Sequence, residues 1–199
     1  MSSNQLATAD PTARPDLSRW GPASWIGAAV TALVVTAAAM TFAPDLARHG
    51  QAGYDVSGVF MTLADLLLLL GVVALVRSGD IRSRGWVRPA AVLAVAGSAA
   101  SVGAELLLRA DFGAGSAAFG VAGPAQAIGF VGLGIAVLVQ RRWHGWRRWT
   151  LLALGAYVPA VLVPALVASG GQSLPALAGF HTLVLLVGLA WRAEVAVTQ

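Results

Sequence analysis

Six apolar runs, each close to 20 residues long, constrain the fold of this chain more than any other feature of its sequence. A helix needs about 20 residues to cross the hydrocarbon core of a bilayer. Hydrophobic residues make up 57% of the 199 residues and charged residues only 11%, far below the roughly 25% of a soluble domain. The runs lie at about 23–43, 57–76, 89–108, 119–139, 150–168 and 174–191. The sequence therefore predicts an all-α, polytopic membrane bundle with six transmembrane helices.

The rest of the chain consists of a tail and short loops. Residues 1–19 are mostly polar, and we expect them to form a disordered cytoplasmic tail. Residues 20–199 are expected to form a single transmembrane domain. The first apolar run is too long for the core of a signal peptide, so we interpret it as a retained anchor.

Arginine supplies all 13 basic residues and sets the expected orientation. Basic residues gather on the cytoplasmic side of membrane proteins. If the N-terminus is cytoplasmic, only Arg48 and Arg109 fall outside. The seven tryptophans fall near the inner helix ends, where we expect their rings at headgroup level, and His144 lies in an inner loop, where we expect it to be solvated. Both termini are therefore expected in the cytoplasm, and the composition favours a bacterial inner membrane.

Polar side chains inside the apolar runs are placed in the outer half of the membrane. At 1.5 Å per residue, Asp65 lies about 12 Å below the outer boundary, Gln126 and His181 about 10 Å, and Glu105 about 5 Å. A charge in hydrocarbon costs at least ~2.5 kcal/mol, so such groups pair or face the bundle interior. Asp65 has no basic residue within one turn, so we expect His181 or Gln126 as its partner. Glu105 precedes Arg109 by four residues, which favours an ion pair on one helix.

Aromatic residues share the outer half with these polar groups and could form an apolar pocket around them. Such a pocket with a few polar groups is typical of a site for a hydrophobic small molecule. Alternatively, the phenylalanines face lipid or pack in the core. Pro159 and Pro164 interrupt the fifth run and are expected to kink it. The candidate substrate-binding residues are Phe60, Phe119, Gln126, Phe130, Tyr157 and Phe180.

Motifs for metal, nucleotide or nucleophile chemistry are absent from the sequence. It has no cysteine, HExxH, DDxxD, P-loop or GxSxG motif. We therefore expect no metal and no cofactor. Loops such as QRRWHGWRRW could bind single-stranded nucleic acid. Membrane topology and attraction to anionic lipid already explain the arginines of these loops, so no nucleic-acid partner is expected.

Acids in an apolar chamber suit proton chemistry, because burial disfavours the ionised carboxylate. Protonation of an alkene gives a carbocation, which aromatic rings stabilise. The chain size, the missing metal motifs and the acids Asp65 and Glu105 resemble small integral-membrane terpene cyclases of microbial secondary metabolism. The resemblance implies a metal-independent isomerase or lyase acting on an isoprenoid. Under this hypothesis Asp65, Glu105 and His181 are the catalytic residues.

Two other functions fit the same residues. A proton-coupled small-molecule transporter could use Asp65 and His181 as a relay. It would need a polar route through the inner half, where the sequence offers only threonines and Tyr157. A non-enzymatic accessory subunit would use its acids to bind partner helices. The expected partners are the lipid bilayer and a hydrophobic small molecule, and no particular protein partner is predicted.

Overall fold

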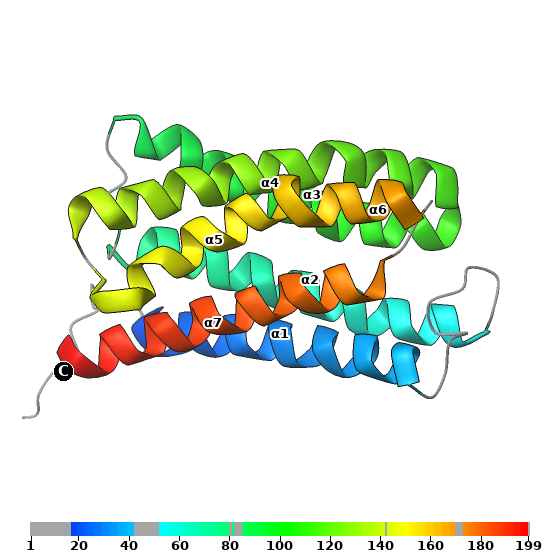
Figure 1. The fold of residues 1–199 in the computed structure, drawn as a ribbon, viewed down its shortest axis with the longest axis horizontal. Coiled ribbons are helices and arrows are strands. Elements are labelled where there is room, and N and C mark those ends of the chain that lie inside the picture. The colour runs from blue at the N-terminus through cyan, green and yellow to red at the C-terminus, as the bar shows by residue number, and fades with distance from the viewer. Residues whose placement is uncertain are drawn as a thin grey trace, which may run out of the picture.

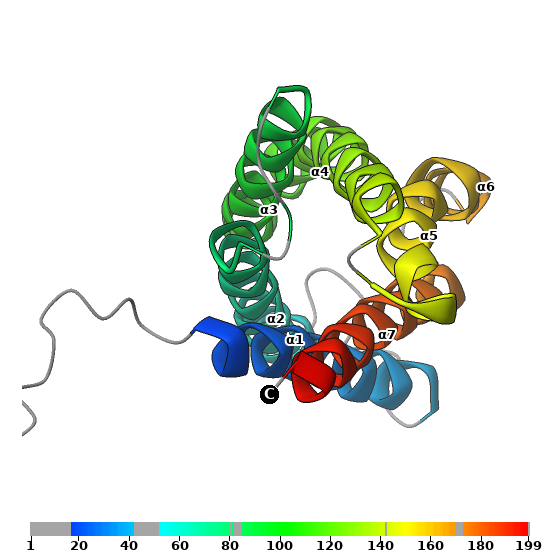
Figure 2. The ribbon, with the colours of Figure 1, turned by 90° about the vertical axis from the view of Figure 1, so that its left-hand side faces the viewer.

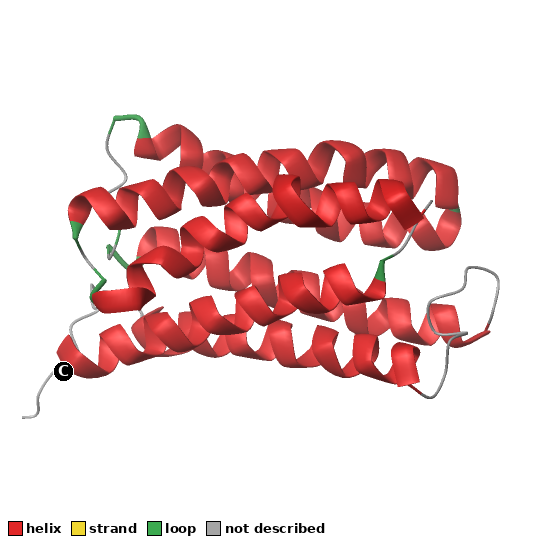
Figure 3. Cartoon of the chain, in the orientation of Figure 1, coloured by secondary structure: helices red, strands yellow, loops and turns green. Residues whose placement is uncertain are grey.

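Helices account for nearly all of the chain that the structure describes (Figures 1 and 3). This computed structural model describes residues 17–41, 52–79, 81, 85–141, 143–169 and 173–198, so residues 1–16 of the expected tail and Arg48 lie outside it. Six helical spans are long and apolar enough to cross a membrane, which confirms the predicted all-α fold with six candidate membrane spans. Five spans contain the helices α1 (Leu17–Thr41), α2 (Ala52–Arg77), α3 (Val87–Ala110), α4 (Phe112–Gln140) and α7 (Leu174–Thr198).

The fifth span is built from four consecutive segments. They are the 3-10 helix η2 (Gly145–Trp149), the helix α5 (Thr150–Tyr157), the π-helix η3 (Val158–Leu162) and the helix α6 (Val163–Ser169). Pro159 lies in the π-helix and Pro164 in the first turn of α6. Proline cannot donate to the helical ladder, so the change of helix type falls where the prolines predict an interruption.

The observed helices extend beyond the apolar runs. The first, α1, begins at Leu17 inside the expected tail, and α7 continues to Thr198. Polar residues can continue a helix past the hydrocarbon, so hydropathy alone marks only the lipid-embedded part. Since α2 begins at Ala52, Asp65 lies near the middle of its helix, and Gln126 lies near the middle of α4. These are positions along the helices, and the expectation that both residues lie in the outer half of the membrane stays a prediction.

The six spans form a closed ring in the order α1, α2, α3, α4, α5 and α7, with α7 returning to α1 (Figure 2). The start of α1 and the end of α7 lie at the same end of the ring, which we call the terminal end. The opposite end is called the distal end. Each helix therefore has two neighbours and one face toward the ring interior.

Glycines allow the backbones of α3 and α4 to approach closely. A Cβ atom at Gly129 would lie 2.3 Å from the backbone nitrogen of Ala94, and one at Gly97 would lie 2.4 Å from that of Gln126. Contacts of this kind exclude any side chain. The contact between α3 and α4, the most extensive in the ring, therefore depends on glycines at these positions.

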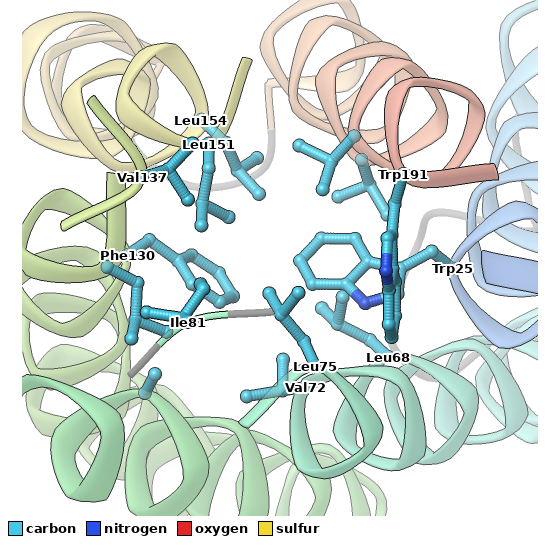
Figure 4. Packing of buried hydrophobic residues seen from close by; sticks show 14 of the residues in the cluster. Trp25, Leu68, Val72, Leu75, Ile81, Phe130, Val137, Leu151, Leu154 and Trp191 are labelled. Carbon is cyan, nitrogen blue, oxygen red and sulfur yellow. The ribbon is translucent and has the colours of Figure 1, made fainter. Parts of the chain in front are cut away.

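Bulky apolar side chains fill the terminal half of the ring (Figure 4). Among the largest fully buried side chains, all except Val184 lie in the terminal half or in its loops: Trp25, Val72, Leu75, Ile81, Phe130, Leu133, Val137, Leu151, Leu154, Val187 and Trp191. Ile81 enters this core from the connection between α2 and α3. This half of the interior is closed by hydrophobic packing.

Three tryptophans belong to this core, contrary to the expected headgroup position. Trp25 and Trp191 are 0% exposed and Trp143 is 3% exposed. The Trp25 and Phe130 rings have centroids 5.8 Å apart. Two glycines make room for Trp25. A Cβ at Gly71 would lie 2.4 Å from the Trp25 ring, and a Cβ at Gly188 would lie 2.9 Å from the Trp25 Cβ. The remaining four tryptophans, Trp20, Trp86, Trp146 and Trp149, are exposed.

We predict that Gly129→Ala destabilises the fold by roughly 1 to 3 kcal/mol, the usual cost of overpacking. The matched control is Gly123→Ala on the same helix, where a Cβ would meet nothing within 4 Å. Thermal unfolding of the two purified variants in one detergent measures the difference. Equal midpoints for both variants would contradict the close α3–α4 contact.

Candidate functional site

Polar side chains meet on the facing sides of α2 and α3. On α2 positions 54, 58, 62 and 65 follow one another at intervals of four, four and three residues, which places them on one stripe of the helix. On α3 the two charged residues are one turn apart. We call this group the polar cluster, and its members are Tyr54, Thr62, Asp65, Glu105 and Arg109.

Arg109 crosses from α3 to α2. Its Nη2 donates to the carbonyl oxygen of Gly58 and to the hydroxyl oxygen of Thr62. A Cβ at Gly58 would lie 2.8 Å from Nε of Arg109, so glycine makes room for the guanidinium. Among the described residues no ion pair joins Arg109 to Glu105. The expected pair along α3 is therefore replaced by a hydrogen-bonded bridge to the next helix.

Asp65 lies between the interior face of α2 and the face toward α3. It is three residues before the buried Leu68, which places it about 60° from Leu68 around the helix axis, on the side of Gly58. The side chain is half-buried. Its carboxyl group makes no hydrogen bond within the described part of the chain. The charged residue that influences it electrostatically is Glu105 on α3.

Glu105 is the second half-buried acid of the polar cluster. It interacts electrostatically with Asp65 across the seam and with Arg109 on its own helix. No side chain or backbone group of the described residues donates a hydrogen bond to it. The neighbouring helices α2 and α3 thus each carry one acid that accepts no hydrogen bond from the described residues.

His181 is not joined to Asp65. Its Nδ1 lies 2.8 Å from the carbonyl oxygen of Leu177 on its own helix, and its ring meets the edge of Phe180 with centroids 5.3 Å apart. Both α2 and α7 pack against α1, which separates the two helices in the ring. Gln126, the other expected partner, donates instead to Ser98 Oγ at 3.0 Å and joins α4 to α3.

The candidate aromatic residues divide into three groups. Phe130 and Phe180 are buried in the core. Phe119 is half-buried and lies 11 residues before Phe130, about 20° away on the helical wheel, so it shares the interior stripe of α4. Tyr157 donates its hydroxyl to the carbonyl oxygen of Ala176 at 3.1 Å and ties the fifth span to α7. Phe60 is 47% exposed, so it is placed on the outer surface of α2 and not in a pocket.

The distal part of the fifth span leaves the ring. Helix α6 has no buried residue, and it projects away from α4 and α7 as the continuation of η3 (Figure 2). The tie from Tyr157 to α7 lies just before this departure. Single π-helical turns are frequent at functional sites, because they shift the direction of a helix without ending it. Helix α6 therefore adds no buried side chain to the distal half of the ring.

Glu194 forms a second charged cluster that the sequence reasoning missed. Its Oε1 accepts from the backbone N–H of His144 at 2.8 Å and from Nη1 of Arg147 at 3.2 Å, and its Oε2 lies 3.1 Å from Nδ1 of His144. The sequence did not indicate this cluster because α7 extends past residue 191, where the apolar run ends, and because the partners of Glu194 lie about 50 residues away in sequence. His144 has an exposed side chain, as expected, yet it helps to fasten η2 to α7.

The chemistry available to the polar cluster is proton transfer. Within the described ranges, no three histidine or acidic side chains gather as metal ligands. Two neighbouring carboxyl groups can hold, donate and accept a proton, and an adjacent cation biases where that proton resides. Glu194, in contrast, has its oxygens occupied by hydrogen bonds and serves to hold a loop.

We predict that Glu194→Ala loosens η2, because it removes hydrogen bonds to a charged, buried acceptor that contribute about 2 kcal/mol. Limited trypsin digestion of the folded protein should cleave residues 141–149 several-fold faster. His144→Ala keeps the backbone N–H bond to Glu194 and should accelerate cleavage less. Equal cleavage rates in the wild type and Glu194→Ala would refute this tether.

The chain was also compared with known proteins. No family model matches it, and neither curated proteins nor solved structures give a match. Its functional residues are therefore assigned from geometry and chemistry alone, with the carboxyl groups of Asp65 and Glu105 as the strongest candidates.

Proposed function

We propose that this protein is an integral-membrane enzyme that cyclises a hydrophobic, isoprenoid-like substrate by acid-initiated chemistry. One acid of the Asp65 and Glu105 pair donates the proton, and the other accepts a proton at the end. The observation that supports the proposal is that two half-buried acids lie on the neighbouring helices α2 and α3, and that neither accepts a hydrogen bond from the described residues. Groups left without partners at this depth are costly, and such groups mark functional sites in membrane proteins.

The proposed reaction is an isomerisation with a closed proton balance. The donor carboxyl group transfers its proton to one carbon of an alkene, whose π electrons form the new C–H bond. The neighbouring carbon becomes a cation, and the π electrons of a second alkene attack it to form the ring bond. The final cation loses a proton to the acceptor carboxylate. Proton transfer between the two neighbouring acids restores the starting state, so no oxidant or other reactant is needed.

Aromatic side chains on the interior stripe suit such cations. Phe119 lies on this stripe of α4, and Phe180 lies on α7 beside His181. Aromatic faces attract cations, and an apolar wall excludes the water that would quench them. The substrate class follows from this combination of two acids with hydrocarbon and aromatic surroundings.

The closed terminal half favours an enzyme over a proton-coupled carrier. A carrier must open its site to both sides, whereas tryptophans and aliphatic side chains fill the terminal half. Of the buried ionisable residues in the described part, Glu194 is the one in that half, and its oxygens are already bonded. A lipid-soluble substrate, in contrast, needs access only from the bilayer or the distal end.

We also propose a bacterial inner-membrane location with both termini cytoplasmic. The start of α1 and the end of α7 lie at one end of the ring, and most arginines of the sequence fall at the helix ends or connections on that side. The positive-inside rule then assigns the terminal end to the cytoplasm. The distal end, where α6 leaves the ring, would face the periplasmic leaflet.

Substitution of either acid tests the proposed function. We expect Asp65→Asn and Glu105→Gln to insert normally but to lower cyclisation of a linear polyene by ~100-fold or more, since general acid–base catalysis contributes on this scale. The assay uses the protein in lipid vesicles with linear isoprenoids of several lengths and detects cyclic isomers by mass spectrometry after gas chromatography.

Asp55→Asn is the matched control, because Asp55 lies on the same helix with an exposed side chain. It should retain wild-type turnover. Wild-type turnover in both test variants would exclude the proposed acid chemistry. Proton-driven uptake of the unchanged polyene into vesicles would favour a carrier instead.

A further inference from the structure

The 3-10 helix η2 is held at the terminal end of the ring beside α7 (Figure 1). Trp143, which precedes it, belongs to the hydrophobic core. Glu194 of α7 accepts from Arg147 and from the backbone N–H of His144. The hydroxyl of Thr150 donates to the carbonyl oxygen of Arg147 at 2.8 Å. These contacts restrain the five residues of η2, so the directions of its exposed side chains are set as well.

The two tryptophans of η2 lie on one face. A 3-10 helix has three residues per turn, so Trp146 and Trp149 are aligned one above the other. Both side chains are exposed. From Thr150 onward, α5, η3 and α6 provide about the 20 residues that a span needs, so η2 falls at the edge of the hydrocarbon. Indoles at this level prefer the headgroup region of the bilayer.

Arg148 places a positive charge beside these indoles. Its Cζ lies 5.6 Å from the centroid of the Trp149 ring. The side chain is exposed, and among the described residues no acid pairs with it. Arg147, in contrast, is half-buried and bonded to Glu194. A guanidinium held over an indole keeps the N–H groups at its edge free for an oxyanion.

The charge of this segment is not balanced. Residues 141–149 contain four arginines and no acidic residue. Glu194 brings one carboxylate to the segment through its pair with Arg147, and one carboxylate cannot balance four guanidinium groups. Uncompensated cations beside two aligned indoles match the phosphate and the adjoining apolar part of a phospholipid. The membrane is favoured over single-stranded nucleic acid, because indoles at the lipid boundary are not free to stack on bases.

We propose that Arg148, Trp146 and Trp149 form a binding site for the phosphate head group of an anionic phospholipid in the leaflet at the terminal end. Arg148 donates to the phosphate oxygens, and the two indoles contact the glycerol and the first acyl carbons. Glu194 is a positioning residue, because it holds η2 in place without touching the lipid. The site is independent of the proposed cyclisation, and it differs from a diffuse attraction of anionic lipid by all the arginines at that end.

Native mass spectrometry of the full chain in detergent tests the site by counting retained lipids. With equal amounts of phosphatidylglycerol and phosphatidylcholine added, we expect the wild type to retain phosphatidylglycerol preferentially. Arg148→Gln should lower this preference by about tenfold, the scale of one hydrogen bond between charged groups. Arg88→Gln is the matched control and should keep the preference. Arg88 is also exposed and lies near the exposed Trp86 at the same end, but no cation–π contact joins these two described residues.

Glu194→Ala separates a built site from diffuse attraction, because the two predict changes of opposite sign. Loss of this acid makes the terminal end more positive, so diffuse attraction would raise the retention of phosphatidylglycerol. Release of η2 should instead lower it. The proposal is overturned if Arg148→Gln and Arg88→Gln have equal effects, or if Glu194→Ala raises the preference. It is also overturned if the protein binds a single-stranded oligonucleotide and Arg148→Gln abolishes that binding.

Discussion

The cost of placing polar groups in hydrocarbon governs how this bundle is held together. Water cannot satisfy such groups at membrane depth, so their partners have to come from other helices or from the backbone. Arg109 reaches α2, Gln126 reaches Ser98 on α3, and Tyr157 reaches the backbone of α7. Each of these contacts joins two different spans of the ring. Asp65 and Glu105 differ from these three residues, because no donor among the described residues meets either carboxyl group.

The ring has two halves with different physical character. In the terminal half, large apolar side chains fill the interior, and dispersion and close packing stabilise it. In the distal half, α6 departs from its neighbours after the π-helical turn, and the interior stripe of α4 is less covered at Phe119 than at Phe130. A site that must stay dry on one side and admit a greasy molecule from the other would need this asymmetry. The same asymmetry weighs against a route for solutes through the ring.

Apolar length and proline position predicted the number of spans and the interruption of the fifth, because these depend on local properties of the chain. The helix ends were less predictable, since polar residues continue α7 beyond residue 191 and bring Glu194 into the fold. Partner choice was the least predictable feature. The spacing of Glu105 and Arg109 indicated an ion pair, but Gly58 and Thr62 on another helix offered the guanidinium a better position. Such competition between near and distant partners depends on helix rotation, which six similar apolar runs do not specify.

The packing of Trp25 against Gly71 also concerns how such a protein can change over evolutionary time. An indole that fills the space left by a missing side chain makes these two positions on α1 and α2 a single heritable unit. A smaller residue at position 25 opens a void that a larger residue at 71 could occupy, whereas either change alone is harmful. Relatives of this chain should therefore show these two positions varying together, even where the rest of the core drifts freely.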